Sequence, residues 1–135
     1  MKSISKLKKE LDKWFSLYIR LRDATDHEGL VQCFTSNRVY HYKSIHAGHF
    51  MSRKRLATRW CESNVQPQSA ADNLFGQGEQ YKFGLNLDAK YGDGAAEELQ
   101  IKSRQTLKMS RIDYEDKISY YKDLVEKIKK EKGIE

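Results

Sequence analysis

Hydrophobic residues recur at alternating spacings of three and four near the start of the chain, the pattern of an amphipathic helix. The repeat consists of Ile4, Leu7, Leu11, Trp14, Tyr18 and Leu21. We predict a helix from about residue 3 to 23, which ends before the polar segment DATDHEG, where Gly29 supplies the break. The repeat indicates a face that is buried in the core rather than a ligand site.

A second repeat of the same kind lies near the C-terminus. Ser110 and Asp113 are spaced as in a capping box, which predicts the start of the last helix. The repeat consists of Tyr114, Ile118, Tyr121, Val125 and Ile128, and the opposite face carries Lys and Glu. Both terminal helices therefore have a narrow heptad seam. The seams can be buried within the chain's own domain, or they can serve a homodimer or another protein partner.

The middle of the chain has a different periodicity. LVQCF and RVYHYKSI are rich in β-branched and aromatic residues and are separated by the turn-like TSN. They predict a β-hairpin over residues 30–50, whose second strand runs toward AGHF. Residues 51–63 are basic and irregular, and helical patterns follow at 70–83 (interrupted by glycines), 79–91 and 94–104. The predicted fold class is α+β and mostly helical, in a single domain of residues 1–135.

Composition narrows the class of protein further. The chain is 39% hydrophobic and 33% charged, which is typical of a globular protein with a modest core. It has no apolar run of the roughly 18 residues that a membrane span needs, and its basic N-terminus lacks the apolar region of a signal peptide. We therefore expect a cytoplasmic protein with no membrane partner. Cys33 and Cys61 fit reduced thiols better than a disulfide framework.

Positive charge is concentrated in the first half of the chain. Residues 1–22 hold seven Lys or Arg and two acids, while residues 29–61 hold six Lys or Arg and no acid. A stretch with charge of only one sign indicates a polyanion, and we predict that the partner is DNA. The predicted DNA-binding residues are Arg38, Lys43, Arg53, Lys54, Arg55 and Arg59. The alternative is a basic surface that binds no ligand.

Histidine and asparagine residues follow the predicted hairpin in a suggestive order. A strand leads to His49, Asn64 lies fifteen residues on, and Asn73 opens a helix. A lone histidine is more often structural, but this strand, loop and helix layout is that of an HNH nuclease, also called a ββα-metal finger. The sequence also resembles the NinG (Rap) family of phage recombination proteins, a branch of the HNH superfamily. The matching features span residues 14–130 and comprise YIRLRD, Cys33, AGHF, SR, RW, NVQPQ, Asn73, the glycines before Tyr81 and a long charged C-terminal helix.

The resemblance implies a fold and a set of roles. It implies a small treble-clef-like ββα-metal core at residues 30–83, between an N-terminal helix (1–23) and a helical C-terminal part (84–135). His49 would be the general base and would lie at the metal, Asn64 would orient the histidine and its loop, and Asn73 would bind the metal. The implied activity is DNA cleavage with Mg²⁺ or Mn²⁺, with branched recombination intermediates as the suggested substrates. Position 46 is His, where many HNH sites have a metal-binding acid.

The family's structural zinc has lost most of its ligands in this sequence. The resemblance implies two CxxC pairs, which fall on Cys33, Ser36, Ser69 and Asp72. A closed zinc site needs four nitrogen or sulfur ligands, so we expect no structural zinc. A site rebuilt elsewhere from Cys61 and the histidines is the less favoured alternative.

The sequence therefore leaves three candidate functions. The first is a metal-dependent DNA endonuclease of the HNH type. The second is a catalytically inactive DNA-binding or scaffold protein derived from such a nuclease. The third is a helical adaptor that binds a protein through its heptad seams. The basic central run argues against this third function, because an adaptor would not need it.

Overall fold

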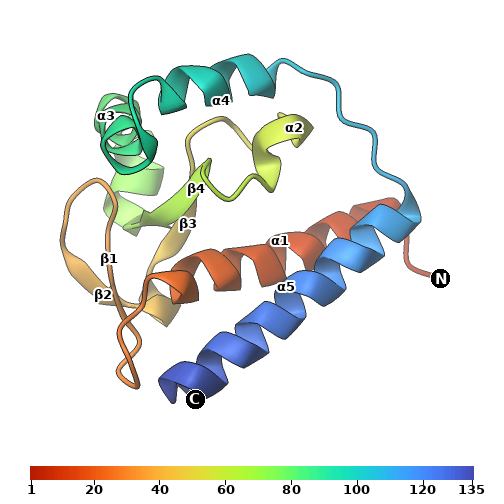
Figure 1. The fold of residues 1–135 in the computed structure, drawn as a ribbon, viewed down its shortest axis with the longest axis horizontal. Coiled ribbons are helices and arrows are strands. Elements are labelled where there is room, and N and C mark those ends of the chain that lie inside the picture. Colours follow the sequence, from red (N-terminus) through yellow and green to blue (C-terminus); the bar gives the residue numbers. More distant parts are fainter.

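The computed structural model describes residues 1–135 and has a mostly helical α+β fold, as predicted (Figure 1). The fold has five α-helices and four short strands, in the order α1 (Ile4–Arg22), β1 (Leu30–Gln32), β2 (Val39–His41), β3 (His46–His49), α2 (Leu56–Arg59), β4 (Val65–Gln68), α3 (Gln80–Tyr91), α4 (Ala95–Ser103) and α5 (Arg111–Lys132). Two single turns complete the fold, a 3-10 turn η1 (Tyr42–Ser44) and a π-helical turn η2 (Ala71–Phe75). None of the helices is apolar enough over its length to cross a membrane.

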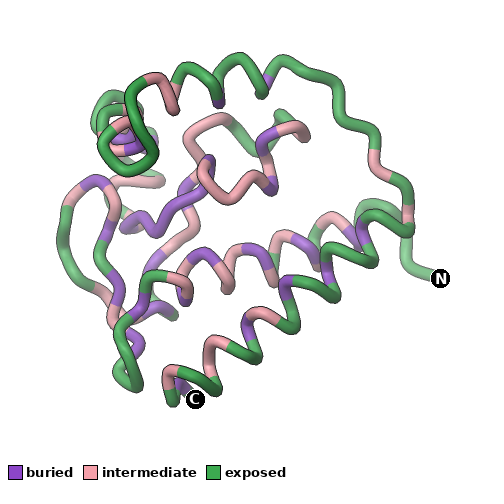
Figure 2. The backbone as a smooth tube through the Cα atoms, viewed as in Figure 1, coloured by how far each residue is buried: buried purple, intermediate pink, exposed green.

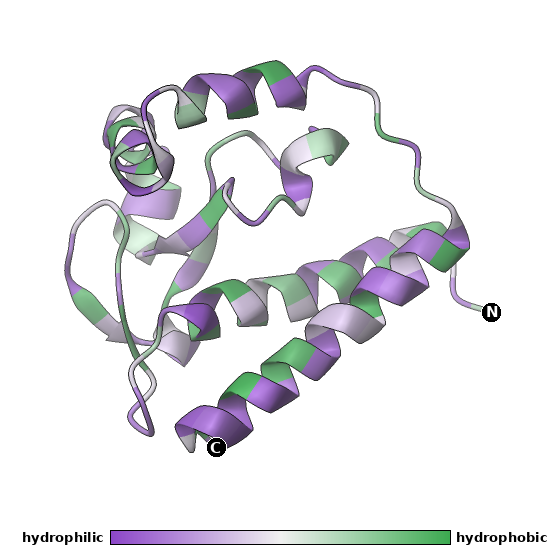
Figure 3. Ribbon diagram, in the orientation of Figure 1, coloured by the Kyte–Doolittle hydropathy of each residue, from purple (hydrophilic) through white to green (hydrophobic).

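The two terminal helices lie side by side and run in the same direction (Figure 1). Their starts are joined by a hydrogen bond from Arg111 to the Lys2 carbonyl, and their ends by one from Lys132 Nζ to the Leu21 carbonyl at 3.0 Å. The predicted capping box is confirmed, because the Ser110 and Asp113 side chains each accept from the other's backbone N–H. Hydrophobic and hydrophilic bands alternate along α5 (Figure 3), and its predicted seam is buried within the chain.

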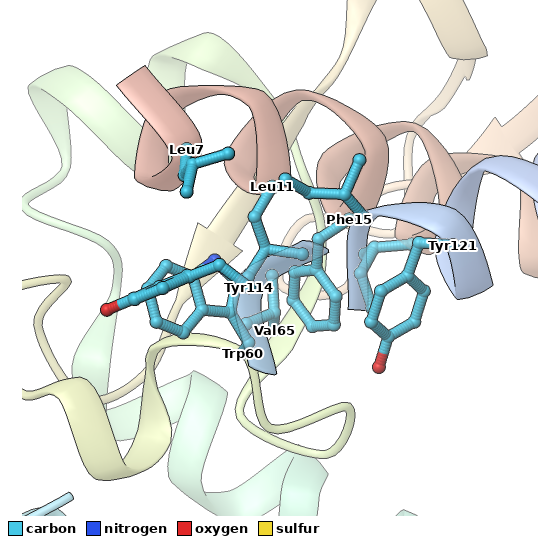
Figure 4. Close-up of a cluster of buried hydrophobic side chains, with 9 residues drawn as sticks. Leu7, Leu11, Phe15, Trp60, Val65, Tyr114 and Tyr121 are labelled. Atoms are coloured by element: carbon cyan, nitrogen blue, oxygen red, sulfur yellow. The ribbon is translucent and has the colours of Figure 1, made fainter. Parts of the chain in front are cut away.

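The main core lies where α1 meets α5 and the β3–β4 region. Figure 4 shows aromatic rings from three elements in contact: Phe15 packs edge-on against Tyr121 at 4.9 Å between centroids, and Trp60 against Tyr114 at 5.6 Å. Edge-to-face pairs of this kind add roughly 0.5–1.5 kcal/mol beyond the area they bury. The core therefore joins the terminal helices to the segment that follows α2.

The predicted buried face of α1 is incomplete. Phe15 and Ile19 are fully buried, while Trp14 and Tyr18 of the predicted repeat are only half-buried and Ile4 is exposed. The reason is that α1 contacts α5 on one side and β3 and β4 on the other, so it needs a wider apolar surface than one seam. Buried and half-buried residues accordingly alternate along most of α1 (Figure 2).

The predicted hairpin over residues 30–50 is wrong in its second half. β1 pairs with β2, but the chain then makes the turn η1 and enters β3, which pairs antiparallel with β4. The His41 side chain caps this turn by accepting from the Lys43 backbone N–H at 3.2 Å, and the turn buries Tyr42. The strand that leads to His49 therefore pairs with VQPQ, 16 or more residues further along the chain, and not with LVQCF.

The predicted helices after residue 70 are confirmed. The glycine-rich interruption separates η2 from α3, and α3 and α4 follow close to the predicted bounds. Phe83 and Leu87 of α3 form a small core with Leu99 of α4, against which Phe34 and Phe50 pack. An exposed linker, residues 104–110, then leads back to the start of α5 (Figure 2).

Two tyrosines of the terminal helices hold a carboxylate from the β3–β4 loop. Tyr18 and Tyr121 each donate to Glu62, at 3.0 Å to separate oxygens. Burial, together with the neighbouring Glu62 charge, raises the pKa of Tyr18 to about 12 from an ordinary 10.0 and also raises the pKa of Tyr121. The folded protein therefore favours the neutral phenols.

This arrangement predicts a loss of stability at alkaline pH. Because the folded pKa of Tyr18 is raised, its contribution is complete below pH 10 and declines as the pH rises from 10 toward 12. We expect the urea midpoint of the wild type to fall more steeply over that window than the midpoint of Tyr18→Phe. The control is Tyr81→Phe, since Tyr81 is 80% exposed. Equal slopes in the wild type and Tyr18→Phe would contradict the prediction.

Candidate functional site

The candidate site is built on β3, β4 and the turn η2. Antiparallel pairing sets His46 opposite Gln68 and His49 opposite Val65, so the two histidines lie at the two ends of β3. Gly48 permits this pairing: a Cβ there would lie 2.2 Å from Gln68 Oε1, closer than atoms can approach. The strands therefore need a glycine between the histidines.

His49 is held by a backbone carbonyl from the end of α2. Its Nε2 lies 3.0 Å from the Arg59 carbonyl oxygen. A carbonyl can only accept, so Nε2 carries the proton and Nδ1 keeps its lone pair. Burial lowers the pKa of His49 below its ordinary 6.5 and outweighs the opposing effect of the Arg59 carbonyl. At neutral pH the side chain is thus a neutral imidazole with one free basic nitrogen.

Asn64 is fully buried, and its side-chain hydrogen bonds go to residues other than His49. Its Oδ1 accepts from the Met51 backbone N–H at 2.8 Å, and its Nδ2 donates to the Met51 and Thr58 carbonyls at 3.1 and 3.0 Å. These three bonds hold Met51 and Thr58 at the two ends of the loop that leads to Arg59. Asn64 can therefore orient His49 only indirectly, through the loop.

Asn73 lies on η2 and faces the start of β3. Its Nδ2 is 3.1 Å from His46 Nδ1, so the amide donates to the imidazole in the tautomer with the proton on Nε2. His46, His49 and Asn73 line one cleft of ≈ 580 Å³, which also receives Arg20 and Lys43. The structure thus brings together two of the three predicted site residues and adds His46.

The cleft has nitrogen and amide donors but no carboxylate. No group of three or more His, Cys, Asp or Glu side chains lies close enough together to hold a metal ion. Mg²⁺ prefers oxygen ligands, often carboxylates, whereas imidazole suits transition metals better. One imidazole and one amide are a poor ligand set for Mg²⁺ or Mn²⁺ by themselves, so water or phosphate oxygens would have to complete the site.

Two of the predicted DNA-binding arginines are paired with an acid of α1. Asp12 accepts from Arg53 at 2.7 Å, from Arg59 at 2.5 and 3.1 Å, and from Trp60 Nε1 at 3.0 Å. Burial would raise the pKa of Asp12, but hydrogen bonds and charge from Arg59 and Arg53 outweigh it and lower the pKa. Arg59 keeps only 16% of its side chain exposed, so its guanidinium supports the loop.

The remaining predicted DNA-binding residues are exposed. Lys43 reaches the cleft from η1, Lys54 and Arg55 lie on the loop before α2, and Arg38 precedes β2. Asp12 was not predicted as a site residue. The one sequence feature that sets it apart is that it is one of two acids in a basic helix.

The four positions at which the resemblance implies CxxC pairs lie together, and Cys33 is the one cysteine among them. Cys33 Sγ accepts from the backbone N–H groups of Ser69 at 3.2 Å and Ser36 at 3.4 Å, and lies 3.9 Å from Asp72 Oδ2. Asp72 Oδ2 accepts from Thr35 at 2.6 Å. Burial raises the pKa of Cys33, but hydrogen bonds from Ser36, Ser69 and Thr35 outweigh it and lower the pKa to about 7. Hydrogen bonds therefore hold this corner of the fold.

The Asn64 contacts predict a structural role for that side chain. Asn64→Ala leaves two carbonyls and one N–H without their buried partner, which should lower the free energy of unfolding by about 2–4 kcal/mol. Asn73→Ala is the matched control, since the Asn73 side chain bonds only to His46. Urea unfolding measures both variants. An Asn64→Ala protein as stable as the control would show that the loop does not depend on this residue.

Comparison with known proteins gives one match. The chain matches the family described as Bacteriophage Lambda NinG protein over residues 1–131. No curated protein and no solved structure matches it. A match that covers nearly the whole chain shows the family, so this chain belongs to the family of the bacteriophage lambda NinG protein.

Proposed function

We propose that the protein is a metal-dependent DNA endonuclease of the HNH type that acts in phage recombination. The observation that carries the proposal is the cleft in which His49, His46 and Asn73 meet, with the tautomer of His49 set by the Arg59 carbonyl. The order of β3, β4 and η2 is the strand–strand–helix order that the HNH resemblance implies. Family membership supports a role in phage recombination.

His49 has the properties that phosphodiester hydrolysis requires of a general base. Its Nδ1 is unprotonated at neutral pH and takes a proton from water as the water oxygen attacks phosphorus. The new bond to phosphorus forms while the bond to the 3′ oxygen breaks, and the departing oxygen then takes up a proton. The Arg59 carbonyl stabilises the imidazolium that forms, because it accepts from the protonated Nε2.

His46 and Asn73 are the residues that would hold the metal ion, once the Asn73 amide turns away from His46 Nδ1 and leaves the lone pair of that nitrogen free to bind. A divalent ion in this position supplies positive charge to the reacting phosphate and the leaving oxygen. The pair offers one imidazole and one amide, so phosphate oxygens and water must complete the ligand set. With oxygen ligands from the phosphate and water, the activating ion that we propose is Mg²⁺ or Mn²⁺.

A DNA-binding or scaffold protein without catalysis is the second candidate. The observation that favours it is the lack of a carboxylate in the cleft, together with the substituted zinc ligands at Ser36, Ser69 and Asp72. Both candidates bind DNA, so only a cleavage assay separates them.

The first prediction for the endonuclease concerns the base. His49→Ala should lower metal-dependent cleavage by about 10²–10⁴ and leave DNA affinity nearly unchanged, because a neutral side chain contributes little to phosphate binding. Since the pKa of His49 is lowered, the wild-type rate should stay high as the pH falls to 6.5 and decline only below it. Initial rates on supercoiled and branched DNA with Mn²⁺, Mg²⁺ or EDTA measure both effects. A folded, DNA-bound wild type that cuts nothing with either ion would leave the second candidate standing.

The second prediction concerns the metal. His46→Asp supplies the absent carboxylate and should lower the Mg²⁺ concentration needed for half-maximal cleavage about tenfold or more, since about 1.4 kcal/mol of added attraction suffices. The matched control is His46→Asn, which shortens the side chain without adding charge. Titration of cleavage rate against Mg²⁺ and Mn²⁺ tests both variants. If His46→Asp needs as much Mg²⁺ as His46→Asn, His46 does not lie at the metal.

A further inference from the structure

The clefts beside His49 extend along α1. A second cleft, of ≈ 270 Å³, adjoins the first, and Ser16, Ala47, His49 and Arg53 line both of them. Arg20 lines only the first cleft, and Lys9 and Lys13 line only the second. Helix α1 is therefore the shared wall of a groove that passes His49.

The cleft-lining residues of α1 form one stripe. Lys9, Lys13, Ser16 and Arg20 follow one another at spacings of four, three and four, which places them on one face of a helix. Eleven residues of helix separate Lys9 from Arg20, a rise of roughly 16 Å. A nucleic acid strand rises about 3.4 Å per nucleotide, so the stripe spans about four to five nucleotides. Its length fits a polymer of phosphates better than a single anion.

Charge in this groove is almost entirely positive. Asp12 is the only acid that lines either cleft, and Arg53, Arg59 and Trp60 already occupy its carboxylate. Lys9 and Lys13 form no ion pair within the chain. The positive charges of the stripe are thus free to meet an anion.

Arg20 is the most firmly held of these cations. Its Nε donates to the Ser16 carbonyl and hydroxyl at 3.2 Å, and its Nη1 donates to the Tyr42 carbonyl at 2.8 Å. All of these acceptors are uncharged, so the guanidinium keeps its full charge. Burial lowers the pKa of Arg20, but an arginine stays protonated. Such a fixed charge can stabilise a phosphate without reorganising.

We propose that α1 carries the DNA backbone past His49, with Lys9 and Lys13 on phosphates to one side and Arg20 on the phosphate that reacts. The role of Arg20 at a reacting phosphate rests on the proposed function, whereas the binding surface does not depend on it. It adds α1 to the DNA-binding surface, which the sequence assigned only to residues 29–61. It also gives the largely buried Arg59 a supporting role in place of direct phosphate contact.

Salt-dependent DNA binding in EDTA tests the surface apart from the chemistry. Each phosphate contact contributes about −0.9 to the slope of log Kobs against log salt on duplex DNA. The double variant Lys9→Gln/Lys13→Gln should flatten the slope by roughly 1–2 units. The matched control is Lys127→Gln/Lys130→Gln, which removes the same charge from exposed positions of α5. Equal slopes in the two double variants would overturn the inference.

Arg20 is tested by binding and cleavage together. Arg20→Gln should flatten the salt slope by about one unit and lower the cleavage rate at saturating DNA by about 10²–10³. Arg20→Lys, which keeps the charge, should retain the slope but lose rate. A purely structural role would leave the slope of Arg20→Gln unchanged, and that result would overturn the assignment. If the wild type binds through α1 and cleaves nothing, the nuclease proposal fails and the binding surface remains.

Discussion

The carboxylate of Asp12 fixes the geometry on which the rest of the cleft depends. It binds Arg53, Arg59 and Trp60 at once, so one side chain of α1 holds the loop that connects β3 to β4. The same loop supplies the Arg59 carbonyl that sets the tautomer of His49. The pKa of Asp12 is lowered in the fold, so its stabilising effect is complete above about pH 4 and is lost as acid protonates it. The orientation of His49, the proposed base, therefore depends on the ion pair between Asp12 and Arg59. Asp12 belongs to α1, which lies outside the proposed ββα unit.

The corner formed by Cys33, Ser36, Ser69 and Asp72 is held by hydrogen bonds. Structural zinc in small fingers supplies on the order of 10 kcal/mol, far more than a few hydrogen bonds at about 1 kcal/mol each. The two N–H groups that point at Cys33 and the bond from Thr35 to Asp72 preserve the local geometry. The stability comes from elsewhere, because α1 and α5 bury an aromatic core that extends to Trp60 and Val65. The long terminal helices thus stabilise the region that positions β3, β4 and η2.

The sequence predicts the helices well because their apolar repeats, caps and glycines are local signals. It predicts the strands less well, because β4, the partner of β3, lies beyond an irregular loop. No local pattern shows that the Gln68 side chain packs where a Cβ of residue 48 would lie. For the site, His49 and Asn73 were placed by motif, and they do line one cleft. Asn64 was expected to orient the histidine and its loop, and its buried hydrogen bonds run to Met51 and Thr58. Asp12 and Arg20 could not be predicted, because their role depends on how α1 packs against the loop, a long-range contact that periodicity does not encode.

The charge of the cleft has a consequence for how the proposed enzyme would assemble. Lys43 and Arg20 surround His46 and Asn73, and no carboxylate is present to attract a divalent ion. Coulomb repulsion therefore opposes metal binding to the free protein. Phosphate groups of bound DNA neutralise these cations and offer oxygen ligands, so each of the two partners favours the binding of the other by the same factor. On this mechanism the metal site would be complete only when DNA occupies the groove, so that hydrolysis would depend on the substrate that α1 holds.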